Sequence, residues 1–205
     1  MIRRLGDGSS AEVAAGGRGG CIGVSVVAGE PFEETEIRVL VGGTSLMVRS
    51  DKLRRLLTLD PGLRAVLMRF NSMLMAQMSV SISCMARHNL DQRLARWLLT
   101  ASQRLGADKL DVGQELLAQI LGVRRTGVSE AFGRLIAIGA ISSTRNHIAI
   151  LDRAGLESRS CECFWEAEAA RRRVAPDVVV SRAIPPDRMM DLVDRYEALA
   201  ALPAT

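Results

Sequence analysis

The segment from Gln114 to Arg134 constrains the fold of this chain more than any other, because its small and apolar residues suit two short crossing helices. If a helix begins at Gln114, Ala118 falls where the two helices come closest and a larger side chain would push them apart. Gly122 falls at the turn, where a left-handed backbone is nearly free for glycine and costly for other residues. The residues expected to point between the helices are Leu117, Leu121, Val123, Val128 and Ala131. This pattern predicts a helix-turn-helix.

The outer face of the second helix carries basic and hydroxyl side chains. A helix-turn-helix lays this face in the major groove of DNA. Arg125 is a candidate for a bidentate contact with guanine, and Arg124 for a phosphate contact at the helix start. Glu130 either accepts from a cytosine amino group or orients Arg134 one turn later. The expected DNA-binding residues are Arg124, Arg125, Thr126, Ser129, Glu130, Arg134 and, in the hairpin that follows, Arg145.

A short hairpin follows the second helix. Gly139 is expected to end that helix, and residues 140–151 then alternate like two strands joined by a turn near Arg145 and Asn146. A helix-turn-helix followed directly by a hairpin is a winged helix. Arg145, at the turn, is a candidate phosphate contact that positions the protein without reading the base sequence.

A long helix is expected before the winged helix, from a break at residues 60–62 to about Arg87. One apolar stripe on it consists of Met75, Met78, Ile82 and Met85. A second line of residues recurs in alternating steps of four and three, like the seam of a coiled coil. A helix that is apolar on two sides needs two surfaces to pack against, which we expect to be its own domain and a second copy of the chain. The alternative is a helix buried inside a single core. The seam residues, expected at the dimer interface, are Leu63, Leu67, Phe70, Leu74, Gln77, Ser81 and Cys84.

The remaining elements complete a fold that we expect to be α+β and mainly α. The first fifty residues have β character in Ile22–Val27 and Ile37–Val41, but are too few to close a barrel alone. Asn89 is expected to cap a helix that Gly106 ends, with Trp97 in the core. One helix is expected from Asp152 to about Arg173, and a short one over 188–202. The expected divisions are 1–50, a partial β segment; 51–86, a helical linker and dimerisation helix; 87–173, the winged helix; and 174–205, a C-terminal extension.

Composition and charge allow a nucleic-acid partner without requiring one. The net charge is +4 and the pI is about 9.2. Residues 87–160 hold eleven basic and seven acidic side chains, an excess equal to that of the whole chain. No apolar segment suits a signal peptide at the start of the chain, and polar residues interrupt the uncharged stretch 70–86, so we expect a cytoplasmic protein with no membrane partner.

The cysteines and histidines do not suggest a metal site from their spacing. Cys21, Cys84, Cys161 and Cys163 form no CxxC pair, and neither His88 nor His147 is spaced from them as zinc ligands usually are. We therefore expect no metal and no cofactor. No paired nucleophile and base or paired carboxylates stand in a recognisable context either, so an enzyme is not expected.

With helix, hinge, helix-turn-helix and wing in this order, the chain resembles the Crp–Fnr family of bacterial transcription regulators, most closely the subgroup with a degenerate cyclic-nucleotide-binding domain. Three segments carry the resemblance: CMARHNLDQRLARWLL at 84–99, ELLAQILGVRRTGVSEAFGRL at 115–135 and HIAILDRAGLESRSCECF at 147–164. Residues 7–30 look like the middle of that family's sensor barrel. The resemblance implies a homodimer joined along the 61–86 helix, whose two recognition helices enter successive major grooves of a near-palindromic operator. The implied partners are double-stranded DNA, a second copy of the chain and RNA polymerase.

The sequence also departs from the family. The first half of the family's barrel has no counterpart here, so the cyclic-nucleotide-binding-like barrel is expected to be partial. Glu36 lies near the position where nucleotide-binding members place an arginine, and a carboxylate there repels a phosphate; Arg38 could replace that arginine only by a shift of register. The leading hypothesis is a sequence-specific DNA-binding regulator. The alternative is a truncated paralogue that heterodimerises through the 61–86 helix without productive DNA binding.

Overall fold

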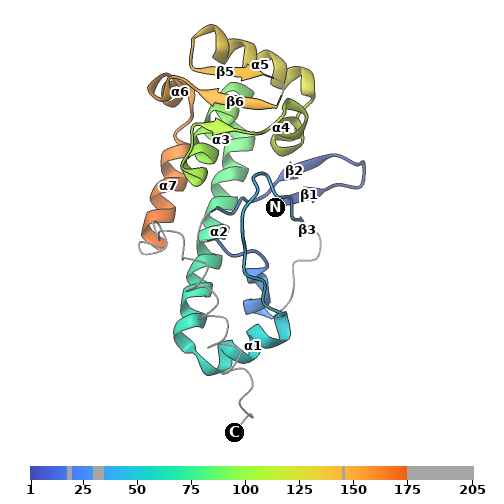
Figure 1. The fold of residues 1–205 in the computed structure, drawn as a ribbon, viewed down its shortest axis with the longest axis vertical. Coiled ribbons are helices and arrows are strands. Elements are labelled where there is room, and N and C mark those ends of the chain that lie inside the picture. The colour runs from blue at the N-terminus through green and yellow to red at the C-terminus, as the bar shows by residue number, and fades with distance from the viewer. Residues whose placement is uncertain (18–19, 30–34, 145, 175–205) are drawn as a thin grey trace.

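A computed structural model describes residues 1–17, 20–29, 35–144 and 146–174 of the chain. Helix α2 (Pro61–Arg87) runs through the molecule as its longest element. The winged helix lies at one end of α2 and α1 (Ser50–Leu59) at the other, with a small N-terminal sheet and α7 (Cys163–Val174) beside it (Figure 1). The expected fold class, α+β and mainly α, is confirmed. The expected helix at 188–202 and most of the 174–205 extension lie outside the described residues.

Local signals set the two ends of α2 where the sequence predicts them. The Asp60 side chain caps the helix, because its Oδ1 atom accepts from the backbone N–H of Leu63 at 2.9 Å. Pro61 is well placed in the first turn, where its missing N–H leaves no hydrogen bond unmade. At the other end His88 takes an extended conformation, and Asn89 then caps α3 (Leu90–Leu105) with a reciprocal bond to Gln92.

The N-terminal segment forms less strand than its sequence suggests. Strands β1 (Ile2–Arg4), β2 (Ser10–Glu12) and β3 (Thr35–Glu36) make an antiparallel sheet in the order β2-β1-β3. The β character expected for Ile22–Val27 is wrong, because the chain turns into a 3₁₀ helix, η1 (Val24–Ala28), between two glycines with positive φ. The second expected piece, Ile37–Val41, is also wrong, because the chain leaves the sheet after Glu36 and packs Leu40 against the core of the winged helix.

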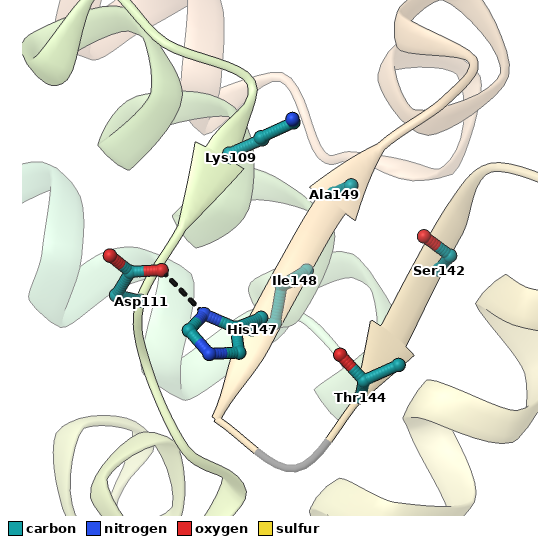
Figure 2. Close-up of a pocket in the computed structure, with 7 residues that line it drawn as sticks. All are labelled: Lys109, Asp111, Ser142, Thr144, His147, Ile148 and Ala149. Carbon is teal, nitrogen blue, oxygen red and sulfur yellow. Dashed lines mark hydrogen bonds and ion pairs between the residues drawn. The ribbon is translucent and has the colours of Figure 1, made fainter.

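The winged helix follows α3. It consists of β4 (Lys109–Leu110), α4 (Gln114–Leu121), α5 (Arg125–Ala137), β5 (Ile141–Thr144), β6 (His147–Ile150) and α6 (Arg153–Arg159). Its antiparallel sheet has the order β4-β6-β5, so the predicted hairpin after Gly139 is confirmed. Side chains alternate across this sheet: Leu110, Ile141 and Ile148 are buried, and their neighbours along the strands form the outer face shown in Figure 2.

One continuous apolar core holds the winged helix together. It joins side chains from α3, α4, α5, the wing and α6, and Trp97 is part of it, as predicted. The side chains that are at most 2% exposed include Leu94, Leu98, Leu99, Leu117, Val128, Phe132, Leu135 and Leu156. The single helix expected from Asp152 is in fact two, α6 and α7. The break falls at residues 160–162, where Ser160 is extended and Cys161 is buried against Cys84.

The face of α2 that was predicted to join two copies of the chain is turned mostly inward. Phe70 and Leu74 are buried against Ala14 and Val24 of the same chain, and Cys84 is buried among other cysteines. The remaining members of the predicted seam, Leu63, Leu67, Gln77 and Ser81, are partly buried. The N-terminal segment and α7 of the same chain therefore cover much of the seam, and its role as a dimer interface stays a prediction.

The opposite face of α2 is exposed and uncharged, and we call it the outer stripe. Met68, Met75 and Ile82 are 43%, 64% and 68% exposed. The stripe recurs in alternating steps of three and four residues and consists of Ala65, Met68, Ser72, Met75, Ser79, Ile82 and Ala86. This spacing keeps its members on one side of a helix, like the seam of a coiled coil.

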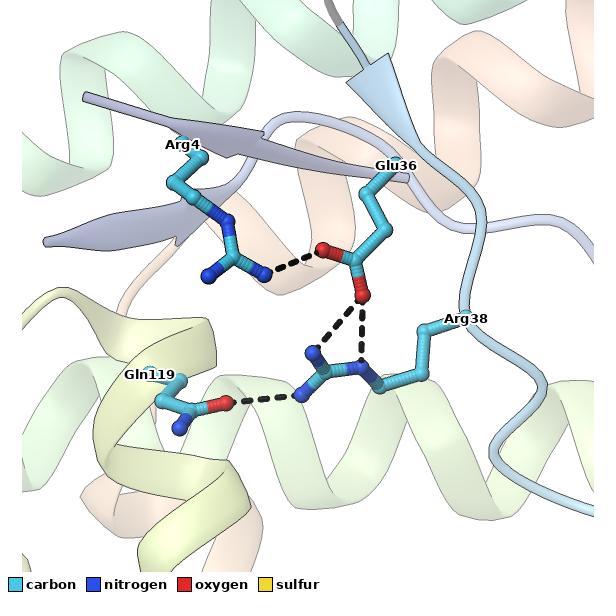
Figure 3. A network of polar contacts seen from close by, with 4 residues as sticks. All are labelled: Arg4, Glu36, Arg38 and Gln119. Atoms are coloured by element: carbon cyan, nitrogen blue, oxygen red, sulfur yellow. Dashed lines mark hydrogen bonds and ion pairs between the residues drawn. The ribbon is translucent and has the colours of Figure 1, made fainter. Parts of the chain in front are cut away.

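A polar network joins the N-terminal sheet to the winged helix (Figure 3). Glu36 accepts from the Arg4 guanidinium at 2.6 Å and from that of Arg38 at 2.7 Å. Arg38 also donates to Oε1 of Gln119 on α4 at 2.7 Å. The hydrogen bond from Arg4, and then that from Arg38, hold the pKa of Glu36 below its usual value.

We expect Gly122→Ala to lower the free energy of unfolding by about 1–2 kcal/mol, because Gly122 has a φ of 65° and an alanine there is strained. The matched variant is Gly133→Ala on α5, where an added Cβ meets nothing within 4 Å. This second change should raise the free energy of unfolding by about 1 kcal/mol. Urea unfolding of both variants measures the difference. A Gly122→Ala protein as stable as the wild type would contradict the account of the turn.

We expect the stability difference between the wild type and Glu36→Gln to depend on pH. A carboxylate whose pKa is lowered on folding stabilises the folded state above its unfolded pKa, and this contribution is lost as the pH falls through the folded value. The difference in the free energy of unfolding should therefore be full at neutral pH and disappear in acid. Urea unfolding over a pH series tests this. Glu115→Gln, at an exposed carboxylate of α4, is the control and should show a smaller difference.

Candidate nucleic-acid interface

The predicted helix-turn-helix is confirmed in the pairing of α4 and α5. Gly122 lies between them in the left-handed region, with φ 65° and ψ 41°, and Val123 donates its backbone N–H to the carbonyl of Ala118 at 3.0 Å. Leu117, Leu121, Val128 and Ala131 are buried in the angle, as predicted, and Val123 is partly buried against the same core. The guanidinium of Arg93 on α3 donates to the carbonyl of Leu121, which fixes the turn to the preceding helix.

Exposed basic residues lie at the start of α5. Arg124 is extended and immediately precedes the helix, and Arg125 and Thr126 begin it; all three are exposed. No side chain of the described residues caps this helix, so its first backbone N–H groups are open to a ligand. The N-terminus of a helix attracts anions through these groups and through the helix dipole. The start of α5 is therefore suited to a phosphate.

Two other predicted residues of α5 are held by the protein itself. Arg134 donates to both carboxylate oxygens of Asp91 on α3, at 2.6 and 2.7 Å, and this bond raises its pKa. Asp91 is thus the hydrogen-bond partner of Arg134, and the charge of Glu130, which was expected either to orient Arg134 or to contact a base, also acts on it. Ser129 donates to Oε1 of Gln114 on α4 at 2.7 Å. Both contacts hold α5 against the neighbouring helices.

Within the described part of the chain, Arg124 and Arg125 have no ion-pair partner. They differ in this from Arg134, whose charge is neutralised by Asp91. A cation without an internal partner binds a phosphate with a more favourable free energy, because no ion pair has to be broken first. The geometry therefore favours Arg124 and Arg125 over Arg134 as ligands of an anion.

The wing lies beside the start of α4. A Cβ added to Gly113 would come within 2.7 Å of the Asn146 side-chain oxygen, so the wing turn and the start of α4 lie in close contact here. Arg145, the predicted wing contact, lies outside the described residues. A shallow hollow of about 210 Å³ lies on the outer face of the wing sheet, lined by the side chains drawn in Figure 2. In it, Nδ1 of His147 lies 2.7 Å from Oδ1 of Asp111. The hollow is smaller than the cavities that hold drug-sized ligands.

Four potential metal ligands meet at the hinge between α2 and the winged helix, and we call Cys84, His88, Cys161 and Cys163 the hinge cluster. Their ligand atoms all lie within 4.8 Å of one another. The Sγ atoms of Cys84 and Cys161 are 3.5 Å apart, and Sγ of Cys163 lies 3.6 Å from Nδ1 of His88. Burial raises the pKa of Cys161, and burial together with the nearby thiols raises that of Cys163 to about 12.

The sequence argument against a metal site does not hold for this cluster. Cys84 lies in the last turn of α2 and His88, four residues later, directly follows the helix. In a sequence expected to be helical to about Arg87, this spacing places the two side chains near one another. This signal was available and was missed. The approach of Cys161 and Cys163 was not visible in the sequence, because it depends on the break between α6 and α7.

None of the helices among the described residues is both long and apolar enough to cross a membrane.

Comparisons with known proteins agree with this geometry. Residues 92–159 match the model of the Crp-like helix-turn-helix domain. Two solved transcriptional regulators from Thermus thermophilus, one of the CRP/FNR family and one of the CRP family, match with TM-scores of 0.56 and 0.55 and identities of 20% and 19%. Each alignment covers 78% of this chain and 81% of the other. A putative regulator of the crp/fnr family from Eubacterium rectale is 26% identical over 45% of this chain and 44% of its own, with a TM-score of 0.39. No curated protein matches the chain.

The resemblance to the Crp–Fnr family is confirmed: residues 92–159 form a Crp-like helix-turn-helix domain, and most of the chain shares the fold of CRP/FNR regulators.

Proposed function

We propose that this chain is a sequence-specific transcriptional regulator that binds a near-palindromic operator as a homodimer. The observation that carries the proposal is the pair of exposed arginines, Arg124 and Arg125, at the uncapped start of the second helix of a Crp-like helix-turn-helix. Cations and open backbone N–H groups at one helix end are what a phosphate backbone and an adjacent base edge require.

The residues of α5 take different roles in this proposal. Arg124 and the first backbone N–H groups of α5 hold a phosphate, and Arg125 makes a bidentate bond to a guanine. Thr126 and Glu130 contact neighbouring bases. Ser129 and Arg134 support α5 through Gln114 and Asp91, and reach DNA only by giving up these contacts. Arg145 is proposed as a phosphate contact from its place between β5 and β6 in the sequence.

The outer stripe of α2 is the proposed dimer interface. Removing its exposed methionines and isoleucine from water is favourable in free energy. A second copy offers an identical surface with the same alternating spacing. A parallel pairing of two α2 helices places both winged helices at the same end of the dimer. Two recognition helices can then reach successive major grooves, whereas an antiparallel pairing would place them at opposite ends.

We expect Arg125→Ala to cost about 1–3 kcal/mol of binding free energy on the selected operator and to relax the choice of base at one position in each half-site. Arg125→Lys should keep most of the affinity for random DNA but lose the preference for one base at that position of the operator. The reason is that lysine lacks the planar guanidinium group that makes two hydrogen bonds to guanine. Fragment selection from genomic DNA followed by sequencing supplies the operator, and fluorescence titration measures the affinities.

Arg159→Ala is the control for this titration, because it removes an exposed arginine from α6, away from the proposed contacts. It should leave both affinities unchanged. Equal losses on the operator and on random DNA for Arg125→Ala would reject the role in base reading. Weak, sequence-indifferent binding by the wild type would instead support the alternative, a heterodimerising module without productive DNA binding.

We expect Met75→Glu and Ile82→Glu to convert a wild-type dimer into monomers, because each places a charge on an exposed apolar position of the outer stripe. Analytical ultracentrifugation at several protein concentrations measures the change. Leu59→Glu is the matched control, because it also replaces a largely exposed apolar residue, but on α1. A wild type that stays monomeric when bound to its operator, or a dimer that both stripe variants leave intact, would overturn this interface.

A further inference from the structure

The hinge cluster brings soft metal ligands from two separate parts of the chain to one point. Cys84 lies in the last turn of α2 and His88 directly follows it, whereas Cys161 precedes α7 and Cys163 begins it. Three cysteines and one histidine are a common ligand set of structural zinc sites. We propose that Cys84, His88, Cys161 and Cys163 bind one Zn²⁺ ion, which joins the end of α2 to the start of α7.

The distances within the hinge cluster fit one tetrahedral ion. With Zn–S bonds of about 2.3 Å, the sulfurs of a tetrahedral site lie about 3.8 Å apart. The Sγ atoms of Cys84 and Cys161 are 3.5 Å apart, Cys163 Sγ and His88 Nδ1 are 3.6 Å apart, and all four ligand atoms lie within 4.8 Å. Small adjustments of rotamers bring all four to bonding distance. An iron–sulfur cluster needs more room, because its ligands bind different iron atoms.

The burial of the cluster is that of a closed structural site. Cys84 is fully buried, Cys161 and Cys163 are each 3% exposed, and the His88 side chain is 14% exposed. Four protein ligands fill the coordination sphere of Zn²⁺ and leave no open position for a substrate. The site is therefore suited to holding two elements together and not to catalysis.

The groups around the cluster also fit a metal site. Nδ1 of His88 faces Cys163, and Nε2 lies 3.2 Å from a carboxylate oxygen of Glu162. A histidine that binds zinc usually donates its other ring N–H to such a carboxylate, which fixes the tautomer. The Arg93 guanidinium is close enough to interact with the Cys84 sulfur, and its positive charge offsets the excess negative charge of three thiolates. Each thiol that binds the ion releases its proton to the solvent.

The proposed ion lies where the orientation of the winged helix is set. α7 packs along α2, and the cluster closes the junction of these two helices at the point where the chain enters α3. A bound ion would hold this junction in one geometry. The proposal does not rest on DNA binding and stands if the proposed operator recognition fails.

The test is to purify the full chain under reducing conditions without chelator and to measure its metals by mass spectrometry. We expect one zinc per chain. Replacement by Co²⁺ should give the thiolate charge-transfer absorption and the intense visible bands of a tetrahedral site. Cys84→Ser and Cys163→Ser should lose the bound ion or weaken the absorption. Cys21→Ser is the matched control and should leave both unchanged, because Cys21 is outside the cluster.

A second measurement uses the wild type alone, in case the cysteine variants do not fold. In the zinc-loaded chain, thiol alkylation followed by mass spectrometry should modify Cys21 alone, and a strong chelator should make the other three cysteines reactive. Glu162→Gln should raise the Zn²⁺ dissociation constant about 10–100-fold. Glu166→Gln, at an exposed carboxylate on α7, should not change it.

Three results would overturn the proposal. One is a folded wild-type chain that binds less than stoichiometric zinc and whose thiol protection is the same with and without chelator. Another is a Co²⁺ spectrum without thiolate absorption. The last is a Cys84–Cys161 disulfide in metal-free protein purified without oxygen, which would identify the cluster as a thiol pair.

Discussion

The burial of one face of α2 inside its own chain is the interaction on which the rest of the structure depends. Phe70 and Leu74 pack against Ala14 and Val24, and Cys84 closes the other end against the start of α7. Because this face is occupied, the outer stripe is left to solvent, and the winged helix is carried at the end of a long, supported helix. The direction of α2 thus decides both where a second copy can pack and where each recognition helix lies.

The elements that the sequence predicted well are those set by local chemistry. Gly122, the cap formed by Asn89 and the start of α2 at Asp60 and Pro61 each act within one turn of the chain, and each was placed correctly. The predictions that were wrong concern contacts between residues that lie far apart in the sequence. Which stripe of α2 turns inward depends on the N-terminal segment, and at the break between α6 and α7 Cys161 lies against Cys84, 77 residues away.

The same division holds within the candidate sites. Helical periodicity was sufficient to place Arg124 and Arg125 on an exposed surface, because the buried residues of α5 fix the opposite face. Periodicity could not show that Arg134 is bound to Asp91, 43 residues earlier on another helix. For the hinge cluster, only the pair of Cys84 and His88 could be seen in the sequence, since the other two ligands arrive through the tertiary fold.

Several contacts hold the winged helix to the rest of the chain, among them the packing of β2 against α4 and of Leu40 against the core. Two others, the polar network and the hinge cluster, differ in strength. The network of Glu36, Arg38 and Gln119 lies near the surface, where solvent weakens charge interactions. The hinge cluster is buried, and an ion there would bind two helices through four ligands. In the proposed function, two recognition helices enter successive major grooves about 34–36 Å apart. This spacing requires each winged helix to keep a fixed orientation relative to α2. With the proposed ion bound, the junction of α2 and α7 would supply this stiffness.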